Sequence, residues 1–300
     1  MRSSDNKQQA TSNKRSPNDP MTAHEDDEAL MTEPALTEAD CLYPPWRVSP
    51  RVRAFVTTRA GGVSLPPYGR CVAGRETSGG LNLGLHTGDD PAHVHENRAR
   101  LLSFAGVRAA WLEQVHGATV VDAADAPLDA RADASVTATS GIACVVMVAD
   151  CLPVLLCDGE GRAVGAAHAG WRGLAAGIIE KTAQRVAALA QGEAANLHAY
   201  LGPAIGPNAF EVGDEVREAF LAAAQPAERD GTAHAFVPHP HAPGKHRADL
   251  YALARQRLAR LGVTRVTGGQ ACTVSEPERF YSYRRDRVTG RMAALIWLAQ

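Results

Sequence analysis

Three short apolar runs in the middle of the chain constrain its fold more than any other feature of the sequence. They cover residues 143–149, 153–157 and 163–167, and each has the length of a strand rather than of a helix. Because the apolar residues are continuous instead of alternating with polar ones, both faces of these strands are expected to be buried. A glycine-rich turn and a helical spacing of apolar residues over 174–189 follow directly. This order predicts an α/β, or mixed α+β, fold with buried mixed β-sheets flanked by helices.

Turn and cap signals predict the other elements. Asp90 and Pro91 supply an N-cap and a first helical residue, and Gly106 ends that helix. Glycine and proline clusters predict long loops over 60–81 and 226–247. No internal repeat is visible, which favours a single mixed domain. Further elements are expected as strands at 52–58, 266 and 293–298 and as helices at 214–222 and 250–261, the last capped by Asp249.

Charge and hydropathy exclude several classes of protein. No apolar run reaches about 18 residues without a charge, because the longest, 141–157, contains Asp150, so no membrane span is expected. The net charge of -2 gives no basic signal for nucleic acid. The first 40 residues carry nine acids and four bases. We therefore expect a disordered acidic tail over residues 1–41, and a mildly basic catalytic domain over 42–300 that suits small anionic substrates.

The chain contains six cysteines, and the sequence favours reduced thiols over disulfides. Three of them have apolar neighbours, and we find no secretory signal before them. A chain of this length does not need bridges to fold, so a reducing cytoplasmic compartment is expected. The six are Cys41, Cys71, Cys144, Cys151, Cys157 and Cys272.

Two histidines and one cysteine fall at breaks between the predicted elements. Cys151 lies between two buried strands, His168 ends the next strand, and His116 lies in a loop. Imidazole and thiolate are ligands that zinc prefers, and three of them leave a fourth position open for chemistry. Their spacing matches no compact zinc motif. They could also be hydrogen-bonded loop histidines beside an inert thiol, or a cysteine nucleophile with a histidine base oriented by Asp150.

Several motifs resemble the YfiH, or laccase-domain, family over roughly residues 42 to 300. One departure is the segment Gly69 to Gly80, which looks like an insertion beside the site. The matching motifs are Asn82-Leu-Gly-Leu-His-Thr-Gly-Asp89, Gln114-Val-His-Gly117, Ala149-Asp-Cys-Leu-Pro-Val154, His168-Ala-Gly-Trp-Arg-Gly173, Leu201-Gly-Pro-Ala-Ile-Gly206, Ser282-Tyr-Arg-Arg285 and Thr289-Gly-Arg291.

The resemblance implies a single-domain mixed α/β fold and a zinc site made by His116, Cys151 and His168, with copper as the other possible metal. It also implies phosphorolysis of purine nucleosides (adenosine, inosine, guanosine and methylthioadenosine) together with adenosine deamination. The expected partners are thus small-molecule purine nucleosides and phosphate, with no nucleic acid and no membrane. Older naming of the family as polyphenol oxidases or laccases, and a proposed role in editing peptidoglycan precursors, give two alternative activities.

Seven residues are candidates for the chemistry itself. Asp150 could act as acid and base, or could support a metal ligand without touching substrate. Arg172, at the start of a predicted helix, is the first candidate for binding phosphate, because free backbone N–H groups and the helix dipole also attract anions there. Weaker candidates for binding phosphate are Arg59, Arg284, Arg285 and Arg291. His86 could line the pocket or transfer a proton.

Three functional hypotheses remain open from the sequence. The first is a zinc-dependent purine nucleoside phosphorylase with deaminase activity, and the second is a cysteine-dependent amide hydrolase acting on cell-wall precursors. The third is a non-enzyme, a zinc-stabilised interaction protein whose acidic tail binds a partner. A multicopper laccase needs several His-x-His pairs, and the single pair His239-Pro-His241 is expected to lie in an exposed loop.

Overall fold

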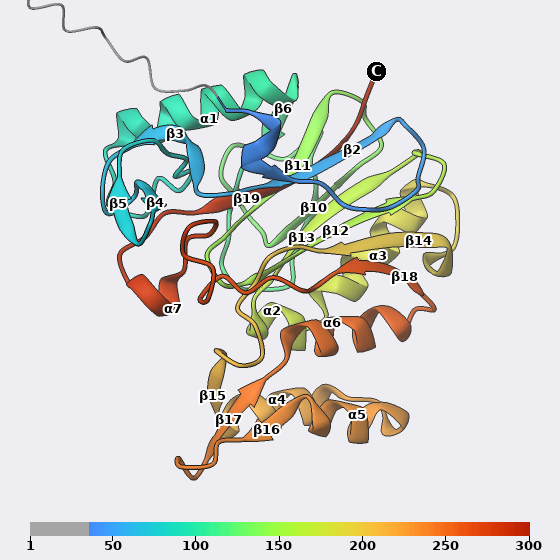
Figure 1. Ribbon diagram of the computed structural model, residues 1–300. Coiled ribbons are helices and arrows are strands. Elements are labelled where there is room, and N and C mark those ends of the chain that lie inside the picture. The colour runs from blue at the N-terminus through green and yellow to red at the C-terminus, as the bar shows by residue number, and fades with distance from the viewer. Residues whose placement is uncertain (1–35) are drawn as a thin grey trace, which may run out of the picture. The chain divides into compact units, whose positions relative to one another are not determined.

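Two β-sheets pack face to face and form the centre of the fold (Figure 1). The computed structural model describes residues 36–300, which fall within one unit. The first sheet has the order β1 (Cys41–Leu42), β2 (Val52–Thr57), β19 (Met292–Leu298), β11 (Ile142–Val148), β6 (Arg108–Ala110). The second has the order β18 (Arg265–Gly268), β14 (Leu197–Leu201), β12 (Leu152–Asp158), β13 (Val164–Ala169), β10 (Ala134–Thr137), β8 (Val120–Asp122).

Helices cover the two outer faces of this pair of sheets. Helix α1 (Pro91–Ala105) packs Leu101 against the first sheet, and α3 (Ile178–Leu189) and α6 (Leu250–Ala259) pack against the second. All residues of β11, β12, β13 and β19 are buried, as expected for strands covered on both faces. Gly165 of β13 lets α3 approach, because a Cβ there would lie 2.8 Å from Val186 Cγ2. The mixed α/β fold expected from the sequence is confirmed.

Smaller elements are attached to this frame. A three-stranded sheet of β15 (Glu211–Gly213), β17 (Lys245–Ala248) and β16 (Phe236–Pro238) lies with α4 (Asp214–Ala223) and α5 (Arg229–His234) beyond α6 (Figure 1). The other elements are β3 (Ala60–Ser64), β4 (Arg70–Val72), β5 (Arg75–Thr77), β7 (Leu112–Glu113), β9 (Ala130–Arg131), α2 (Trp171–Ala175), α7 (Tyr283–Asp286) and the 3-10 helices Glu38–Asp40, Ala194–Asn196 and Pro226–Glu228.

The predicted helix caps are present. The Asp90 side chain accepts from Ala92 N at 2.8 Å, Pro91 is the first residue of α1, and Gly106 ends the helix at φ +66°. Asp249 caps α6 by accepting from Ala252 N at 2.9 Å. Among the described residues, no helix is long and apolar enough to cross a membrane.

Three predicted segments were wrong. The helix expected over 174–189 is two helices, α2 and α3, because Gly177 at φ +85° turns the chain between them. The loop expected over 60–81 contains β3 and the hairpin β4–β5. The loop expected over 226–247 contains α5, β16 and most of β17. Strands β16 and β17 pair with each other, and β17 also pairs with β15, which lies before this segment.

The predicted disordered tail of residues 1–41 is also wrong over its last six residues. Leu36 is buried against Gly61, residues 38–40 form a 3-10 helix, and Cys41 pairs with Thr57 in the first sheet. Residues 1–35 of that prediction lie outside the described residues.

Candidate active site

The three predicted ligands meet at one end of β12 and β13. Cys151 directly precedes β12, and His168 lies on the neighbouring β13, opposite Pro153 in the antiparallel register. His116 joins them from the loop after β7. Their ligand atoms all lie within 4.8 Å of one another, with 3.8 Å between Cys151 Sγ and His116 Nε2. Antiparallel pairing of two short strands thus brings together residues that lie 17 apart in the chain.

A buried carboxylate that the sequence analysis missed holds both histidines. Asp133 Oδ1 lies 2.8 Å from His168 Nδ1 and accepts from His116 N at 2.8 Å, and its Oδ2 accepts from Gly117 N at 2.6 Å. Because Nδ1 of His168 is engaged, its Nε2 is the nitrogen left to face the cysteine. Asp133 stands between two alanines with no recognisable motif around it, so nothing local in the sequence reveals this role.

The backbone around the three ligands has conformations that are uncommon outside glycine. His116 has φ +59° and Asp150 has φ +97°. Such conformations cost energy and persist where surrounding contacts fix them, often at functional sites. Gly170 lies against the ligands, since a Cβ there would be 3.0 Å from His116 Cδ2 and 3.1 Å from Cys151 Sγ. Only glycine fits this position without moving a ligand.

The electrostatics of the cluster favour a thiolate. Burial opposes ionisation of Cys151, but the neighbouring His168 and His116 rings more than offset it and lower the pKa of the thiol to about 6. Burial would also lower the pKa of His168, but the Cys151 thiolate and the Asp133 carboxylate raise it to about 9. One thiolate and two imidazoles form the donor set typical of zinc or copper, and the cluster can therefore hold a metal ion.

The cluster opens into a cavity of about 580 Å³. His86 and Arg291 line it with two cationic or polar groups, and the half-exposed Tyr283 contributes an aromatic ring. Gln114 is fixed in the wall, because its amide accepts from Met147 N at 2.6 Å and donates to Met147 O at 2.9 Å. The remaining lining residues are Leu112, Glu113, Met147, Val148, Ala149 and the three ligands. The volume is within the range of small-molecule sites.

His86 is a predicted catalytic residue that lines this cavity, together with the weaker candidate Arg291. Burial, followed by the nearby Arg291 and Arg98 guanidinium groups, lowers the pKa of His86 below its usual value. At neutral pH its imidazole is therefore neutral and able to accept a proton.

Asp150 adjoins the cluster but does not line the cavity. Its Oδ1 accepts from Thr273 Oγ1 and its Oδ2 accepts from Arg284 N, both at 2.6 Å. Arg284 N belongs to the first turn of α7, which also presents Tyr283. Asp150, which directly precedes Cys151, thus holds α7 through its carboxylate. This arrangement fits the supporting role rather than proton transfer.

Arg172, the preferred arginine, and the weaker candidate Arg59 lie outside the cavity lining. Arg172 is exposed, with its guanidinium 4.4 Å from the centroid of its neighbour Trp171. Arg59 is buried and donates to the carbonyl oxygens of Gly69 and Pro277, both at 3.0 Å, so it supports the loops around it. Arg291, considered only a weaker candidate, is the arginine that faces the cavity, and it lies directly before β19.

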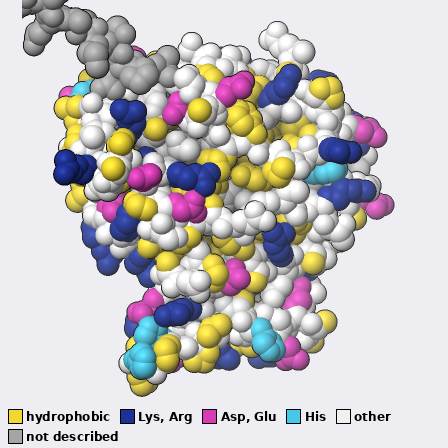
Figure 2. Space-filling view, viewed as in Figure 1, with side chains coloured by type: hydrophobic (Ala, Val, Ile, Leu, Met, Phe, Trp, Pro, Cys, Tyr) yellow, Lys and Arg dark blue, Asp and Glu magenta, His cyan; other side chains and the backbone are white. Residues whose placement is uncertain are grey.

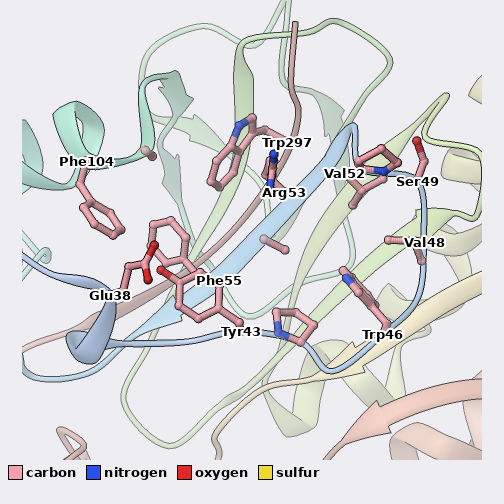
Figure 3. A pocket seen from close by; sticks show the side chains of 14 residues that line it. Glu38, Tyr43, Trp46, Val48, Ser49, Val52, Arg53, Phe55, Phe104 and Trp297 are labelled. Atoms are coloured by element: carbon pink, nitrogen blue, oxygen red, sulfur yellow. The ribbon is translucent and has the colours of Figure 1, made fainter.

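Two other features of the molecule do not contribute to this site. A second cavity of about 470 Å³ lies along β2 and is lined by aromatic side chains, among them Tyr43, Phe55 and Trp297 (Figure 3), but by none of the predicted site residues. Histidine side chains gather at the small three-stranded sheet (Figure 2), where the rings of His239 and His241 are 6.4 Å apart. Within residues 36–300, only the His116, Cys151 and His168 cluster brings three metal-ligating side chains together.

Comparison with known proteins agrees with the resemblance seen in the motifs. Residues 53–299 match the family described as multi-copper polyphenol oxidoreductase laccase. A Pseudomonas aeruginosa protein named purine nucleoside phosphorylase is 52% identical over 257 residues, covering 86% of this chain and 98% of the relative. The Escherichia coli purine nucleoside phosphorylase YfiH is 50% identical over 260 residues, with the same coverage of 86% and 98%.

Solved structures show the same fold. A crystal structure of a Neisseria meningitidis protein superimposes with a TM-score of 0.77 at 46% identity, over 87% of this chain and all of that one. The structure of YlmD from Geobacillus stearothermophilus gives a TM-score of 0.75 at 30% identity, over 89% and 99%. With a family match over most of its length and relatives at half identity, the chain belongs to the YfiH, or laccase-domain, family.

Proposed function

We propose that this protein is a zinc-dependent purine nucleoside phosphorylase that also deaminates adenosine. The observation that carries the proposal is one cavity that joins a metal-binding donor set to an arginine, a neutral histidine and an exposed aromatic ring. The names of the relatives support the phosphorylase activity. Adenosine, inosine, guanosine and methylthioadenosine are the proposed nucleosides, and phosphate is the second substrate.

His116, Cys151 and His168 would hold the metal, with zinc favoured by the mixed nitrogen and sulfur donors and copper as the other candidate. A zinc ion bound there supplies Lewis-acid polarisation of a substrate atom held against it. Asp133 fixes the tautomer of His168 through Nδ1, and Gly170 leaves the space that the ligands need.

The other residues would bind and orient the two substrates. The Arg291 guanidinium would bind phosphate through charge-assisted hydrogen bonds. Neutral His86 beside it can accept a proton from phosphate, which leaves a more nucleophilic dianion to attack C1′ of the ribose. The bond between C1′ and the purine nitrogen breaks, its electron pair passes to that nitrogen, and the purine takes up a proton from solvent. His86 then releases the proton it received, so the charges balance. Tyr283 offers a ring on which the base can stack, and Asp150 would position Tyr283 by holding α7.

A cysteine-dependent amide hydrolase remains a second candidate, supported by one specific observation. In the metal-free protein the pKa values of Cys151 and His168 favour a thiolate beside an imidazolium, which is the ion pair of an activated cysteine nucleophile. Such an enzyme would act without metal and would be inactivated by thiol alkylation.

Replacing Cys151 with alanine tests the first proposal against the second. The variant should lose zinc and should lose phosphate-dependent release of hypoxanthine from inosine, whereas Cys71→Ala, at a half-buried thiol outside the cavity, should keep both. Full zinc content and full turnover in Cys151→Ala would refute the proposal. The hydrolase would be favoured if metal-free wild type acted on amide-linked cell-wall precursors and iodoacetamide abolished this activity.

Two broader expectations join the proposal. Residues 42–300 are proposed as the catalytic domain. The segment before it begins at Leu36, which is buried, and ends at Cys41, which pairs with Thr57 in the first sheet. All six cysteines are unpaired, which supports a reducing, cytoplasmic compartment.

A further inference from the structure

We infer that Asn82 is a positioning residue that holds Arg291 and the segment carrying His86 in one fixed arrangement. The inference rests on the proposed function, because it assigns Arg291 and His86 to the phosphate end of the cavity. Asn82 itself is buried and does not line the cavity. It lies outside the residues that would touch substrate, so its effect must pass through the two segments it joins.

The side-chain amide of Asn82 uses its full hydrogen-bonding capacity on these two segments. Its Oδ1 accepts from Arg291 N at 2.8 Å and from Gly84 N at 3.1 Å. Its Nδ2 donates to Thr87 Oγ1 at 2.9 Å and to Asp89 Oδ2 at 3.0 Å. A primary amide has two donor hydrogens and two acceptor lone pairs, and here all four are engaged. One side chain therefore bonds the backbone before His86, two side chains after it, and the backbone of Arg291.

Direct packing strengthens the same link. Gly84 lies against the stem of Arg291, since a Cβ at Gly84 would be 2.8 Å from Arg291 Cγ and 2.9 Å from Thr87 Cγ2. The backbone adds a further bond, in which Leu83 N donates to Arg291 O at 3.1 Å. Arg291 in turn donates from Nη1 to Thr289 O at 3.1 Å and to Gly290 O at 3.0 Å, which orients the guanidinium. The arginine is thus held at its backbone, its stem and its head.

The groups brought together share one electrostatic environment. Arg291 and Arg98 both act on His86, and Arg98 is held to the same segment because its Nε donates to Leu83 O at 2.9 Å. A small anion bound between His86 and Arg291 would need both groups at a fixed separation. Displacing a positioned group by about 1 Å can cost on the order of 100-fold in rate or binding, so a fixed arrangement has functional value here.

The chain offers a matched control in Asn97. It is equally buried and also makes four hydrogen bonds, to Val63 N, Ser64 Oγ, Gly80 O and Asn82 O. One of these bonds reaches the backbone oxygen of Asn82, but none reaches the side-chain amide of Asn82, Arg291 or the residues between Gly84 and Asp89. Loss of Asn97 should therefore lower thermal stability about as much as loss of Asn82, without moving the two groups at the cavity.

The experiment compares Asn82→Ala and Asn97→Ala in the zinc-loaded full chain. We expect Asn82→Ala to raise the KM for inorganic phosphate about 10-fold or more, with the KM for inosine and the zinc content within about twofold of wild type. Asn97→Ala should leave all three quantities within about twofold. Equal KM increases in the two variants, or an unchanged phosphate KM in Asn82→Ala, would overturn the inference.

Two additions keep the test decisive. If Asn82→Ala does not fold, Gly84→Ala introduces one methyl group against Arg291 Cγ without leaving a polar group unpaired, and it should raise the phosphate KM in the same direction. Phosphate-dependent increase of the melting temperature is measured in parallel. If wild type lacks phosphorolysis but shows this increase, and Asn82→Ala alone loses it, the proposed function fails while the inference stands. If wild type shows neither, both are refuted.

Discussion

Replacing Asp133 with asparagine should weaken metal binding while leaving the three ligands in place. The carboxylate accepts four hydrogen bonds, two at each oxygen, from His168 Nδ1 and from the backbone N–H groups of Val115, His116 and Gly117. An amide keeps one acceptor oxygen and presents an NH₂ group to the other two donors. The change preserves shape and volume, so its effects come from hydrogen bonding and charge.

The size of the effect follows from these bonds. A buried donor left without an acceptor costs about 1–3 kcal/mol, and one of the four bonds is long, at 3.3 Å. We expect the free energy of unfolding to fall by about 3 kcal/mol, which corresponds to a decrease of about 6–12 °C in Tm for a domain of this size. Loss of a carboxylate that orients a metal-bound histidine typically costs 10–100-fold in metal affinity.

Asp158→Asn provides the matched control for this prediction. Asp158 is buried and also accepts four hydrogen bonds, from Glu160 N, Arg162 N, Arg162 Nε and Ala163 N. It lies at the far end of β12 from Cys151, about 23 Å away at about 3.3 Å per residue. Competition titration with a zinc chelator, together with thermal unfolding, should show similar losses of stability but weaker zinc binding only in Asp133→Asn. Wild-type zinc affinity in Asp133→Asn, or an equal loss in both variants, would refute the reasoning.

Three further predictions concern the metal site and the control residue Asp158. Gly170→Ala should reduce zinc affinity at least about 10-fold, because the added methyl group pushes toward His116 and Cys151. Chelator competition measures the zinc affinity. An unchanged affinity would show that this contact does not restrict the two ligands. In metal-free protein, iodoacetamide should label Cys151 at a rate that rises with pH and reaches half its maximum near pH 6. Burial raises the pKa of Cys144 to about 12, so mass spectrometry should find Cys144 unlabelled at pH 7. The opposite order of labelling would contradict the assignment. Burial tends to raise the pKa of Asp158, but hydrogen bonds from Ala163 N and from Arg162 lower this pKa below its usual value. The contribution of Asp158 to stability is therefore complete above about pH 4 and is lost as the pH falls through the folded-state pKa. Denaturant unfolding of Asp158→Asn should therefore show a weaker decline of stability below pH 4 than wild type, and an identical decline would exclude this role.

The sequence predicts the central strands and the caps because both depend on local patterns. Burial on two faces requires continuous apolar residues, as in 143–149, and a cap requires one polar side chain beside the first turn, as at Asp90. The strands within 60–81 were missed because β4 and β5 have only three residues each and β3 contains two glycines, so none shows the apolar pattern of a longer strand. Glycine at 177 is compatible with a helical spacing of its neighbours, so the break between α2 and α3 is visible only in its positive φ.

In the candidate site, too, the residues marked by a local pattern were predicted and those placed by distant contacts were not. His116, Cys151 and His168 were predicted because their chemistry and their motifs mark them, and the structure places them together. Arg172 was preferred for its position at the start of a helix, but the sequence does not say which way its side chain points, and it lies over Trp171. Asp133 was missed because its partners lie 16 to 35 residues away along the chain.

X-ray absorption at the zinc edge tests the central claim most directly. Zinc-loaded protein should show one sulfur at about 2.3 Å and two imidazole nitrogens at about 2.0–2.1 Å, with one further light atom completing the coordination. Cys151→Ala should lose the sulfur signal and the bound metal. A zinc ion surrounded by two or more sulfur atoms, or a protein that binds no metal with its three ligands intact, would contradict the account.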